Sequence, residues 1–436
     1  MLGLMAIGLA AIHVSELADA SMTDNLTRQL MFVPVALAAF FLMLLLPYPA
    51  LGQMSYLLFG ATLLALAGVF LLEPTRGSYR WYAVGPIKIQ PSEIAKFTTI
   101  IMLAWYLRYG DHYRRLRGLI VPFLLTLVPM GLVLMEPDLG TGMLFLPTLF
   151  IMLFVAGARL KHLLVILGLG VSLVLLPMLL PVDAAKFQRE RSGFTARSLG
   201  PVTLYSVDKS RDWHKRPKDV PVAYARLQWR DGTVYDIQPL ALRVMAGNDQ
   251  TAERAQRVAA WLRPDDPRLA MGKGFQPRLG RLILGSGGMT GGDWSQETAG
   301  QADGVGGEDY FSVLPDDHTD FIFCVVGGQW GFVGCLVILL LYAVIFLFGL
   351  EIAVVTYDPF GRLLVVGVLA LLFSQIIINV GMTLGLTPVT GMTLPWISYG
   401  GTSLVVNCAA VGLLINVGQH RPILLGRRPF EHGDGD

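Results

Sequence analysis

The chain has 436 residues, of which 53% are hydrophobic and 15% are charged. Soluble globular domains carry about 25% charged residues, so this composition argues against a soluble enzyme. A net charge of +2 gives no support for nucleic-acid binding. The charge is also uneven, because residues 183–297 hold 32 of the 66 charged side chains and the rest is very apolar. These figures predict a polytopic membrane protein that contacts membrane lipid and no nucleic acid.

Ten apolar runs are candidates for crossing the hydrocarbon core, which takes about 20 helical residues. The first lacks the basic start of a signal peptide, so we interpret it as a membrane helix. We therefore predict an all-α fold with about ten transmembrane helices. The candidate spans are 1–18, 30–48, 51–72, 92–108, 118–135, 141–157, 160–181, 321–349, 363–385 and 400–418.

Basic residues in the short loops orient these spans, since such residues concentrate on the cytoplasmic side. They cluster at 108–117, 159–161 and 421–428, which share one face if the N-terminus is cytoplasmic. Both termini are then cytoplasmic. The opposite face receives four segments, namely 80–90, 136–141, 182–320 and 388–401.

This topology divides the chain into four parts. Residues 1–181 form helices one to seven, 182–320 a large extracytoplasmic loop, 321–420 helices eight to ten, and 421–436 a cytoplasmic tail. Within the loop, about 195–248 is predicted to be a small β-rich insertion with an Asp231-Gly232 hairpin turn. Its expected strands are Val202–Val207, Val222–Trp229 and Thr233–Gln238, and a short helix is expected at Thr251–Leu262.

Two further features of the sequence favour ordinary structural roles. Residues 284–307 are rich in glycine, which favours a flexible loop over a backbone cradle for an anion. The cysteines Cys324, Cys335 and Cys408 lie in apolar stretches without metal-ligand spacing, so we expect them to pack in the core.

Three charged groups stand where expected helices meet the outer face. Glu93 and Lys96 are three residues apart on a helix opened by Pro91, so they can pair, either to fix packing or to act in function. Glu136 and Asp138 lie at a break between two spans. Asp138 can cap the next helix, or the two carboxylates can hold a cation or a polar head group.

Asp320 precedes the eighth span directly. Residue type alone favours a helix N-cap, whereas a carboxylate at a low-dielectric boundary can have the raised pKa that suits a general base. The stretch 393–404 is broken by proline and glycine at membrane depth. Such backbone is tolerated only when it is buried in protein or lines a cavity.

In this order, these segments resemble the SEDS family (shape, elongation, division and sporulation) of bacteria. The resemblance covers nearly the whole chain except about 192–253. The matching residues are Arg80-Trp81, Gln90–Lys96, Glu136–Thr141, Gly285–Gly288, Leu314-Pro315 with His318–Phe323, and Ile397–Gly401.

The resemblance implies an inverting peptidoglycan glycosyltransferase in the bacterial cytoplasmic (inner) membrane. It would polymerise lipid II, an undecaprenyl-pyrophosphate-linked donor, on the outer face, with a class B penicillin-binding protein as partner. The family's essential aspartate falls on Asp320, which makes general base its expected role. The other expected substrate-binding residues are Arg80, Trp81, Gln90, Ser92, Glu93, Lys96, Glu136, Asp138, Arg189, Arg191, His318, Thr319 and Ser398. A divalent cation, Mg or Mn, can share the task of neutralising pyrophosphate, with ligands that the sequence does not identify.

The sequence departs from the family pattern in three places. Gly328 and Gln329 stand where two acidic residues are usual, and Gly292 replaces a lysine that could bind phosphate. The segment 188–191 is separated from its usual downstream part by an insertion of about 60 residues. These departures keep open a catalytically inactive scaffold for a penicillin-binding protein. A charged Glu93–Lys96 pair inside the membrane keeps open a lipid II flippase.

Overall fold

The computed structural model describes most of the apolar sequence and parts of the long loop. It forms two compact units, Met1–Arg159 with Gln276–Asp436, and Leu160–Phe275. The described residues are 1–18, 24–72, 80–84, 87–109, 112–136, 138–179, 182–183, 194–199, 202–207, 224–228, 234–237, 261, 275–292 and 318–420. Arg189, Arg191, the glycines 304–307 and the tail 421–436 lie outside them, as does all of the expected helix at 251–262 except Trp261.

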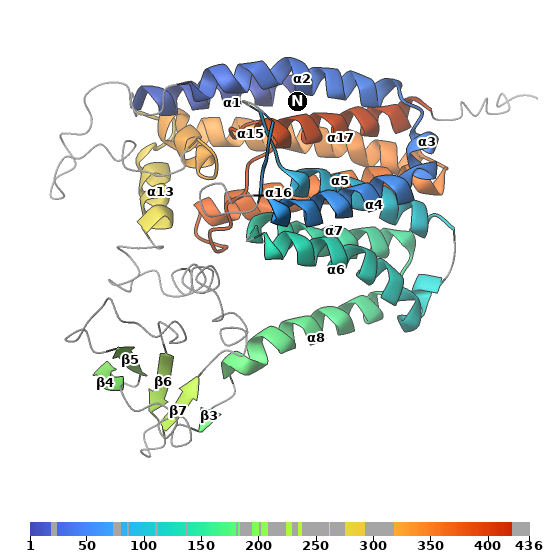
Figure 1. Ribbon diagram of the computed structural model, residues 1–436. Coiled ribbons are helices and arrows are strands. Elements are labelled where there is room, and N and C mark those ends of the chain that lie inside the picture. Colours follow the sequence, from blue (N-terminus) through green and yellow to red (C-terminus); the bar gives the residue numbers. More distant parts are fainter. Residues whose placement is uncertain are drawn as a thin grey trace, which may run out of the picture. The chain divides into compact units, whose positions relative to one another are not determined.

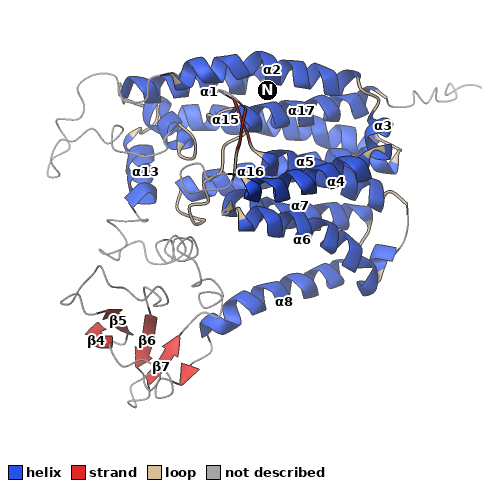
Figure 2. Ribbon diagram, viewed as in Figure 1, coloured by secondary structure: helices blue, strands red, loops and turns tan. Residues whose placement is uncertain are grey.

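The first unit is a helical bundle (Figures 1 and 2). Its core elements are long apolar helices joined mostly by short connections. The helices are α1 (Leu2–Ala18), α2 (Asn25–Leu45), α3 (Tyr48–Gln53), α4 (Ser55–Gly68), α5 (Pro91–Leu107), α6 (Ile120–Met135), α7 (Leu139–Ala156), α13 (Phe275–Ser286), α15 (Ile322–Val355), α16 (Pro359–Thr383) and α17 (Gly401–Gln419).

Each predicted span overlaps a helix of the structure, with α8 (Leu160–Leu179) of the second unit as the seventh. Among the described residues, six helical segments are long and apolar enough to cross a membrane by length and composition. They are Asn25–Leu45, Leu116–Met135, Leu139–Ala156, Ile322–Val355, Pro359–Thr383 and Gly401–Gln419. The prediction of an all-α polytopic membrane fold is confirmed.

Helices α2 and α17 lie side by side and run in the same direction (Figure 1). At one end, Gly401 packs against the ring of Phe32, and at the other the Asn416 amide donates to the Met43 and Leu44 carbonyls. Gly412 has no side chain, so the backbone of Phe40 can approach it closely. Parallel packing of α2 and α17 agrees with the predicted topology, in which seven spans, an odd number, lie between them.

Helix α5 lies inside the bundle, between α4, α7 and α16. Most of its residues are buried, including Glu93 and Lys96. Because α5 is surrounded by protein, its charged residues are shielded from lipid. Gly367 allows α16 to pack closely against Ile100 of α5 and Met152 of α7, since a side chain there would overlap both.

Helix α15 is broken at Gly331, where φ is 63° and ψ is −160°. The turn 287–292 that follows α13 docks on this break. Phe332 N–H donates to the Gly288 carbonyl oxygen at 2.9 Å, and Gly292 N–H donates to the Gly328 carbonyl oxygen at 3.1 Å. The flexible-loop interpretation is therefore wrong for 287–292. The glycines allow two backbones to touch, and Gly331 has a left-handed φ that other residues rarely adopt.

We expect Gly287→Ala to destabilise the protein by about 1–3 kcal/mol, as other overpacking substitutions do. A Cβ atom at Gly287 would overlap the carbonyl oxygen of Gly327. This carbonyl belongs to the backbone of α15, so it cannot shift to make room. Gly285→Ala is the matched control, because a Cβ there meets nothing within 4 Å. Thermal unfolding of both variants in detergent measures the difference, and equal melting temperatures would contradict the docked turn.

The second unit contains α8 and a five-stranded antiparallel sheet, in the order β3-β7-β6-β5-β4. Strand β5 has the predicted bounds, and β6 and β7 lie inside the predicted ranges. Sequence reasoning did not anticipate β3 and β4. The strands are β3 (Val182–Asp183), β4 (Phe194–Leu199), β5 (Val202–Val207), β6 (Tyr224–Gln228) and β7 (Val234–Ile237).

In the first unit, Cys324, Cys335 and Cys408 are free and buried, as core packing predicts.

Candidate functional site

A short hairpin carries two predicted site residues to the turn between α6 and α7. Strands β1 (Tyr82–Val84) and β2 (Ile87–Ile89) pair antiparallel, so Arg80 before β1 and Gln90 after β2 lie at the same end. Arg80 Nε donates to the Glu136 carbonyl oxygen at 3.0 Å. Gln90 Nε2 donates to Asp138 Oδ2 at 2.8 Å. We call Arg80, Gln90, Ser92, Glu136 and Asp138 the hairpin cluster.

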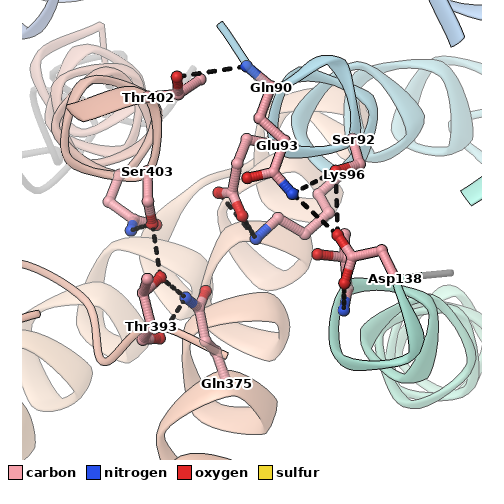
Figure 3. A network of polar contacts seen from close by, with 11 residues as sticks. Gln90, Ser92, Glu93, Lys96, Asp138, Gln375, Thr393, Thr402 and Ser403 are labelled. Carbon is pink, nitrogen blue, oxygen red and sulfur yellow. Dashed lines mark hydrogen bonds and ion pairs between the residues drawn. The ribbon is translucent and has the colours of Figure 1, made fainter. Parts of the chain in front are cut away.

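Asp138 is the N-cap of α7, as one of the two interpretations predicted. Its Oδ1 accepts from Thr141 N–H at 3.1 Å. Its Oδ2 accepts from Gln90 Nε2 and also from the Ser92 hydroxyl at 3.2 Å (Figure 3). Asp138 therefore joins the starts of α5 and α7, and both of its oxygens are occupied by donors.

Glu136 is buried with 0% of its surface exposed. Both carboxylate oxygens are without a hydrogen-bond partner among the described residues. Burial, and to a lesser extent the nearby Asp138, raise the pKa of Glu136 to about 8, although Arg80 opposes the shift. At neutral pH the Glu136 side chain is therefore mostly protonated.

The raised pKa predicts that the melting temperature falls as pH rises from 4.5 to about 8. In this window the folded protein keeps a proton on Glu136 that the unfolded chain has released, so alkalinity favours unfolding. Glu136→Gln keeps a neutral side chain of the same shape and should flatten the fall. Thermal unfolding in detergent at pH 5, 6, 7 and 8 measures both slopes. If wild type and Glu136→Gln have the same slope, Glu136 is ionised in the folded protein over this whole pH range.

Glu93 and Lys96 form the predicted ion pair one turn further along α5 (Figure 3). Lys96 Nζ lies 3.0 Å from Glu93 Oε1 and 2.9 Å from Oε2. Both residues are buried. Lys96 also lines a cavity of about 10 Å³ with Thr99, Thr148 and apolar side chains of α5, α7 and α16. A volume of this size holds about one water molecule.

The residues 318–320, which we call the aspartate turn, precede α15. The N-cap of α15 is Phe321, so the N-cap interpretation of Asp320 is wrong. Each backbone carbonyl of this turn accepts a hydrogen bond from another element. Tyr399 N–H donates to the His318 carbonyl at 2.9 Å, the Ser398 hydroxyl to that of Thr319 at 2.5 Å, and Asn379 Nδ2 to that of Asp320 at 3.2 Å.

The non-helical segment 384–400 joins α16 to α17, and its part from 389 to 398 is mostly buried in protein. Polar side chains of the flanking helices satisfy its backbone, as membrane depth requires. Gln375 Nε2 donates to the Thr393 carbonyl at 2.8 Å, and the Tyr342 hydroxyl donates to that of Pro395. The Thr393 and Ser403 hydroxyl oxygens lie 2.9 Å apart (Figure 3). These contacts hold the segment 384–400 in place. We call this segment the platform, because its residues Ser398 and Tyr399 contact the aspartate turn.

The start of α17 connects this platform to the hairpin cluster. The Thr402 hydroxyl accepts from Gln90 N–H at 3.3 Å (Figure 3). It also donates to the Lys88 carbonyl at 3.1 Å. Ser398, four residues earlier, holds the aspartate turn. The hairpin cluster, the aspartate turn and the platform therefore lie at one end of the bundle, as the predicted topology requires.

The structure thus brings together most of the described residues that the sequence singled out. Trp81 is partly buried beside the hairpin, and His318 lies with its ring 5.6 Å from that of Tyr399. Sequence reasoning missed Asn379, Gln375 and Thr402. The sequence feature that could have identified them is a polar residue inside an apolar run, because such a side chain usually has a partner.

The ligands of the expected divalent cation stay unassigned among the described residues. Among them, no three His, Cys, Asp or Glu side chains lie together. Asp138 accepts hydrogen bonds on both oxygens, and Glu136 holds its proton at neutral pH. Because Mg²⁺ is often held by one or two carboxylates together with substrate phosphates, the Mg or Mn ion remains a proposal.

Comparisons with known proteins agree with the fold. A family model named for FtsW, RodA and SpoVE, described as cell cycle protein, matches residues 1–195 and 233–422. Stage V sporulation protein E of Bacillus subtilis is 30% identical over 96% of this chain and 94% of its own. Peptidoglycan glycosyltransferase RodA of Treponema pallidum is 29% identical over 96% of this chain and 95% of its own.

Solved structures show the same architecture. A chain in a structure described as coordination of polymerization and crosslinking by a peptidoglycan synthase complex has a TM-score of 0.65 and 27% identity, with 97% of each chain covered. The rod shape determining protein RodA of Thermus thermophilus has a TM-score of 0.58 and 25% identity, with 97% of this chain and 95% of that chain covered. The chain belongs to the FtsW/RodA/SpoVE family, which is the SEDS family that its motifs resemble.

Proposed function

We propose that this protein is an inverting peptidoglycan glycosyltransferase that polymerises lipid II. The observation that carries the proposal is the aspartate turn. It holds Asp320 by three backbone hydrogen bonds at the end of the bundle where the hairpin cluster lies. Relatives along nearly the whole chain are named peptidoglycan glycosyltransferases.

In this proposal Asp320 is the general base. As the acceptor sugar hydroxyl attacks the anomeric carbon of the donor, its proton passes to the Asp320 carboxylate. The bond between the anomeric carbon and the pyrophosphate oxygen breaks, and the pyrophosphate leaves with the bonding electrons. One displacement inverts the anomeric centre, so a second carboxylate is not needed as nucleophile. Proton transfer by a positioned base contributes about 10²–10⁴-fold to such reactions.

The other residues have supporting roles in this reaction. Arg80 is the guanidinium that the structure describes in the hairpin cluster, and such groups neutralise pyrophosphate well. Arg189 and Arg191 are proposed to share this task. His318 and Thr319 flank the base and are proposed to orient the acceptor. Lys96 already pairs with Glu93 inside the bundle, which favours a structural role for it.

We further propose that the site faces outward from the bacterial cytoplasmic membrane, with both termini inside, and that a class B penicillin-binding protein is the partner. Basic residues in the short loops support this orientation. The related chain in a peptidoglycan synthase complex supports a partner of this kind. The segment about 195–248 is proposed as an insertion, and the family model leaves 196–232 unmatched.

Proteoliposomes with fluorescent lipid II test this function against its two alternatives. The purified full chain is reconstituted with a class B penicillin-binding protein, and glycan chains are resolved on a gel. Access of a membrane-impermeant quencher to lipid II is measured in parallel. We expect chains without rapid transfer between leaflets. Rapid transfer without chains would favour the flippase, and neither activity in a verified complex would favour the scaffold.

A further inference from the structure

The aspartate turn is held by a segment that is itself not helical. Ser398 and Tyr399, which hold the carbonyls of Thr319 and His318, lie just before α17. Two residues earlier, Trp396 has a φ of 61°, in the left-handed region that a bulky side chain rarely adopts. Such a backbone persists only where its surroundings hold it in place. A contact that holds the backbone of residues 398–400 in place therefore also positions the backbone carbonyls of the aspartate turn.

Gln29 of α2 supplies such a restraint. Its side-chain Oε1 accepts from Gly400 N–H at 3.1 Å, and its Nε2 approaches the Ser398 carbonyl oxygen at 3.5 Å. Gln29 is only 2% exposed. The first contact has ordinary hydrogen-bond geometry, and the second is at the outer limit of distance. The Gln29 amide, more than 360 residues away in sequence, thus contacts both Ser398 and Gly400.

We propose that Gln29 is a positioning residue for the reaction. It acts through a chain of contacts, from Gln29 to Gly400 and Ser398, and from Ser398 to the Thr319 carbonyl beside Asp320. The inference rests on the proposed function, because it assigns Gln29 an effect on the step in which Asp320 takes a proton. Gln29 itself does not need to touch substrate.

The side chain has the length and the two polar atoms that this role needs. Methionine has a similar shape but cannot accept the Gly400 N–H or donate to Ser398. Glutamate keeps an oxygen for Gly400 N–H. Because small misplacements of catalytic groups cost up to about 10²-fold in rate, we expect Gln29→Met to lower kcat by about 10- to 100-fold. The KM for lipid II should stay within about twofold, and Gln29→Glu should retain more activity than Gln29→Met.

Asn416 offers a matched control on the same pair of helices. Its amide donates to the carbonyls of Met43, Leu44 and Leu46 at the opposite end of α2 and α17. Like Gln29, it is a buried amide that ties α2 to the α17 region. Asn416→Leu therefore removes an equivalent structural contact far from the aspartate turn.

The experiment measures kcat and KM for fluorescent lipid II and the melting temperature of the full chain with its class B partner. Wild type, Gln29→Met, Gln29→Glu and Asn416→Leu are compared per folded molecule. We expect Asn416→Leu to lose stability but keep kcat, and Gln29→Met to lose kcat. Should Gln29→Met fail to fold, Gln29→Asn, whose amide is one methylene too short, takes its place with the same expectation.

Three results would overturn the positioning role. The first is an unchanged kcat in Gln29→Met. The second is a parallel loss of kcat and stability in Gln29→Met and Asn416→Leu, which would indicate general packing. The third is an inactive wild type, which would remove the proposed function and the positioning role together. Activity in wild type separates the first two results from the third.

Discussion

Replacing Asp320 with asparagine is expected to lower the rate of lipid II polymerisation by about 10²–10⁴-fold, the usual contribution of a general base. Asparagine has the same shape but cannot take up the acceptor proton. The hydrogen bonds that hold the turn use the backbone carbonyls of His318, Thr319 and Asp320, so they do not depend on the carboxylate. The variant should therefore fold and bind lipid II normally.

The measurement is the initial rate of polymerisation, with melting temperature and lipid II binding recorded for the same samples. Asp358→Asn is a matched control, because Asp358 is the N-cap of α16 and its Oδ2 accepts from Gly361 N–H at 2.9 Å. It should cost little stability, because asparagine caps a helix about as well as aspartate, and the rate should not fall. A fully active Asp320→Asn would mean that another group accepts the proton.

Lys96→Met is expected to produce the largest loss of stability, about 3–5 kcal/mol, as for other broken buried pairs. The substitution leaves the Glu93 carboxylate buried in α5 without its cation. The double variant Glu93→Leu with Lys96→Met removes both charges and should recover most of the loss, because a buried ion pair contributes little beyond an apolar pair.

Thermal or denaturant unfolding of the four proteins, wild type, both single variants and the double variant, gives the coupling energy between Glu93 and Lys96. A single variant as stable as wild type would contradict a buried pair in which each charge needs its partner. A double variant no more stable than Lys96→Met would show that Lys96 stabilises the bundle through other groups, such as the cavity that it lines with Thr99.

Local signals in the sequence predicted the helices and the contacts within them. Length and hydrophobicity located the spans, and the spacing of Glu93 and Lys96 predicted their pairing. Pro91 opens α5 and Asp138 caps α7, both as residue type suggests. Each of these features depends on residues within one or two turns, which is the range over which propensity and periodicity act.

Contacts between distant segments were beyond such reasoning. The hairpin that brings Arg80 to Glu136 has strands of three residues, too short for a periodic signal. The docking of 287–292 on the break at Gly331 joins two glycine-rich stretches whose partnership no local pattern reveals. N-cap chemistry suited Asp320, yet the chain turns one residue later and places Phe321 at the cap.

Polymerisation of labelled lipid II by the full chain tests the central claim most directly. The chain is combined with a class B penicillin-binding protein whose transpeptidase serine is replaced, so that strands remain uncrosslinked and can be resolved on a gel. The partner alone and the complex with Asp320→Asn complete the set. We predict glycan strands from the complex with the wild-type chain and none from the other two. Strands from the partner alone, or equal strands from the Asp320→Asn complex, would contradict a glycosyltransferase site at Asp320.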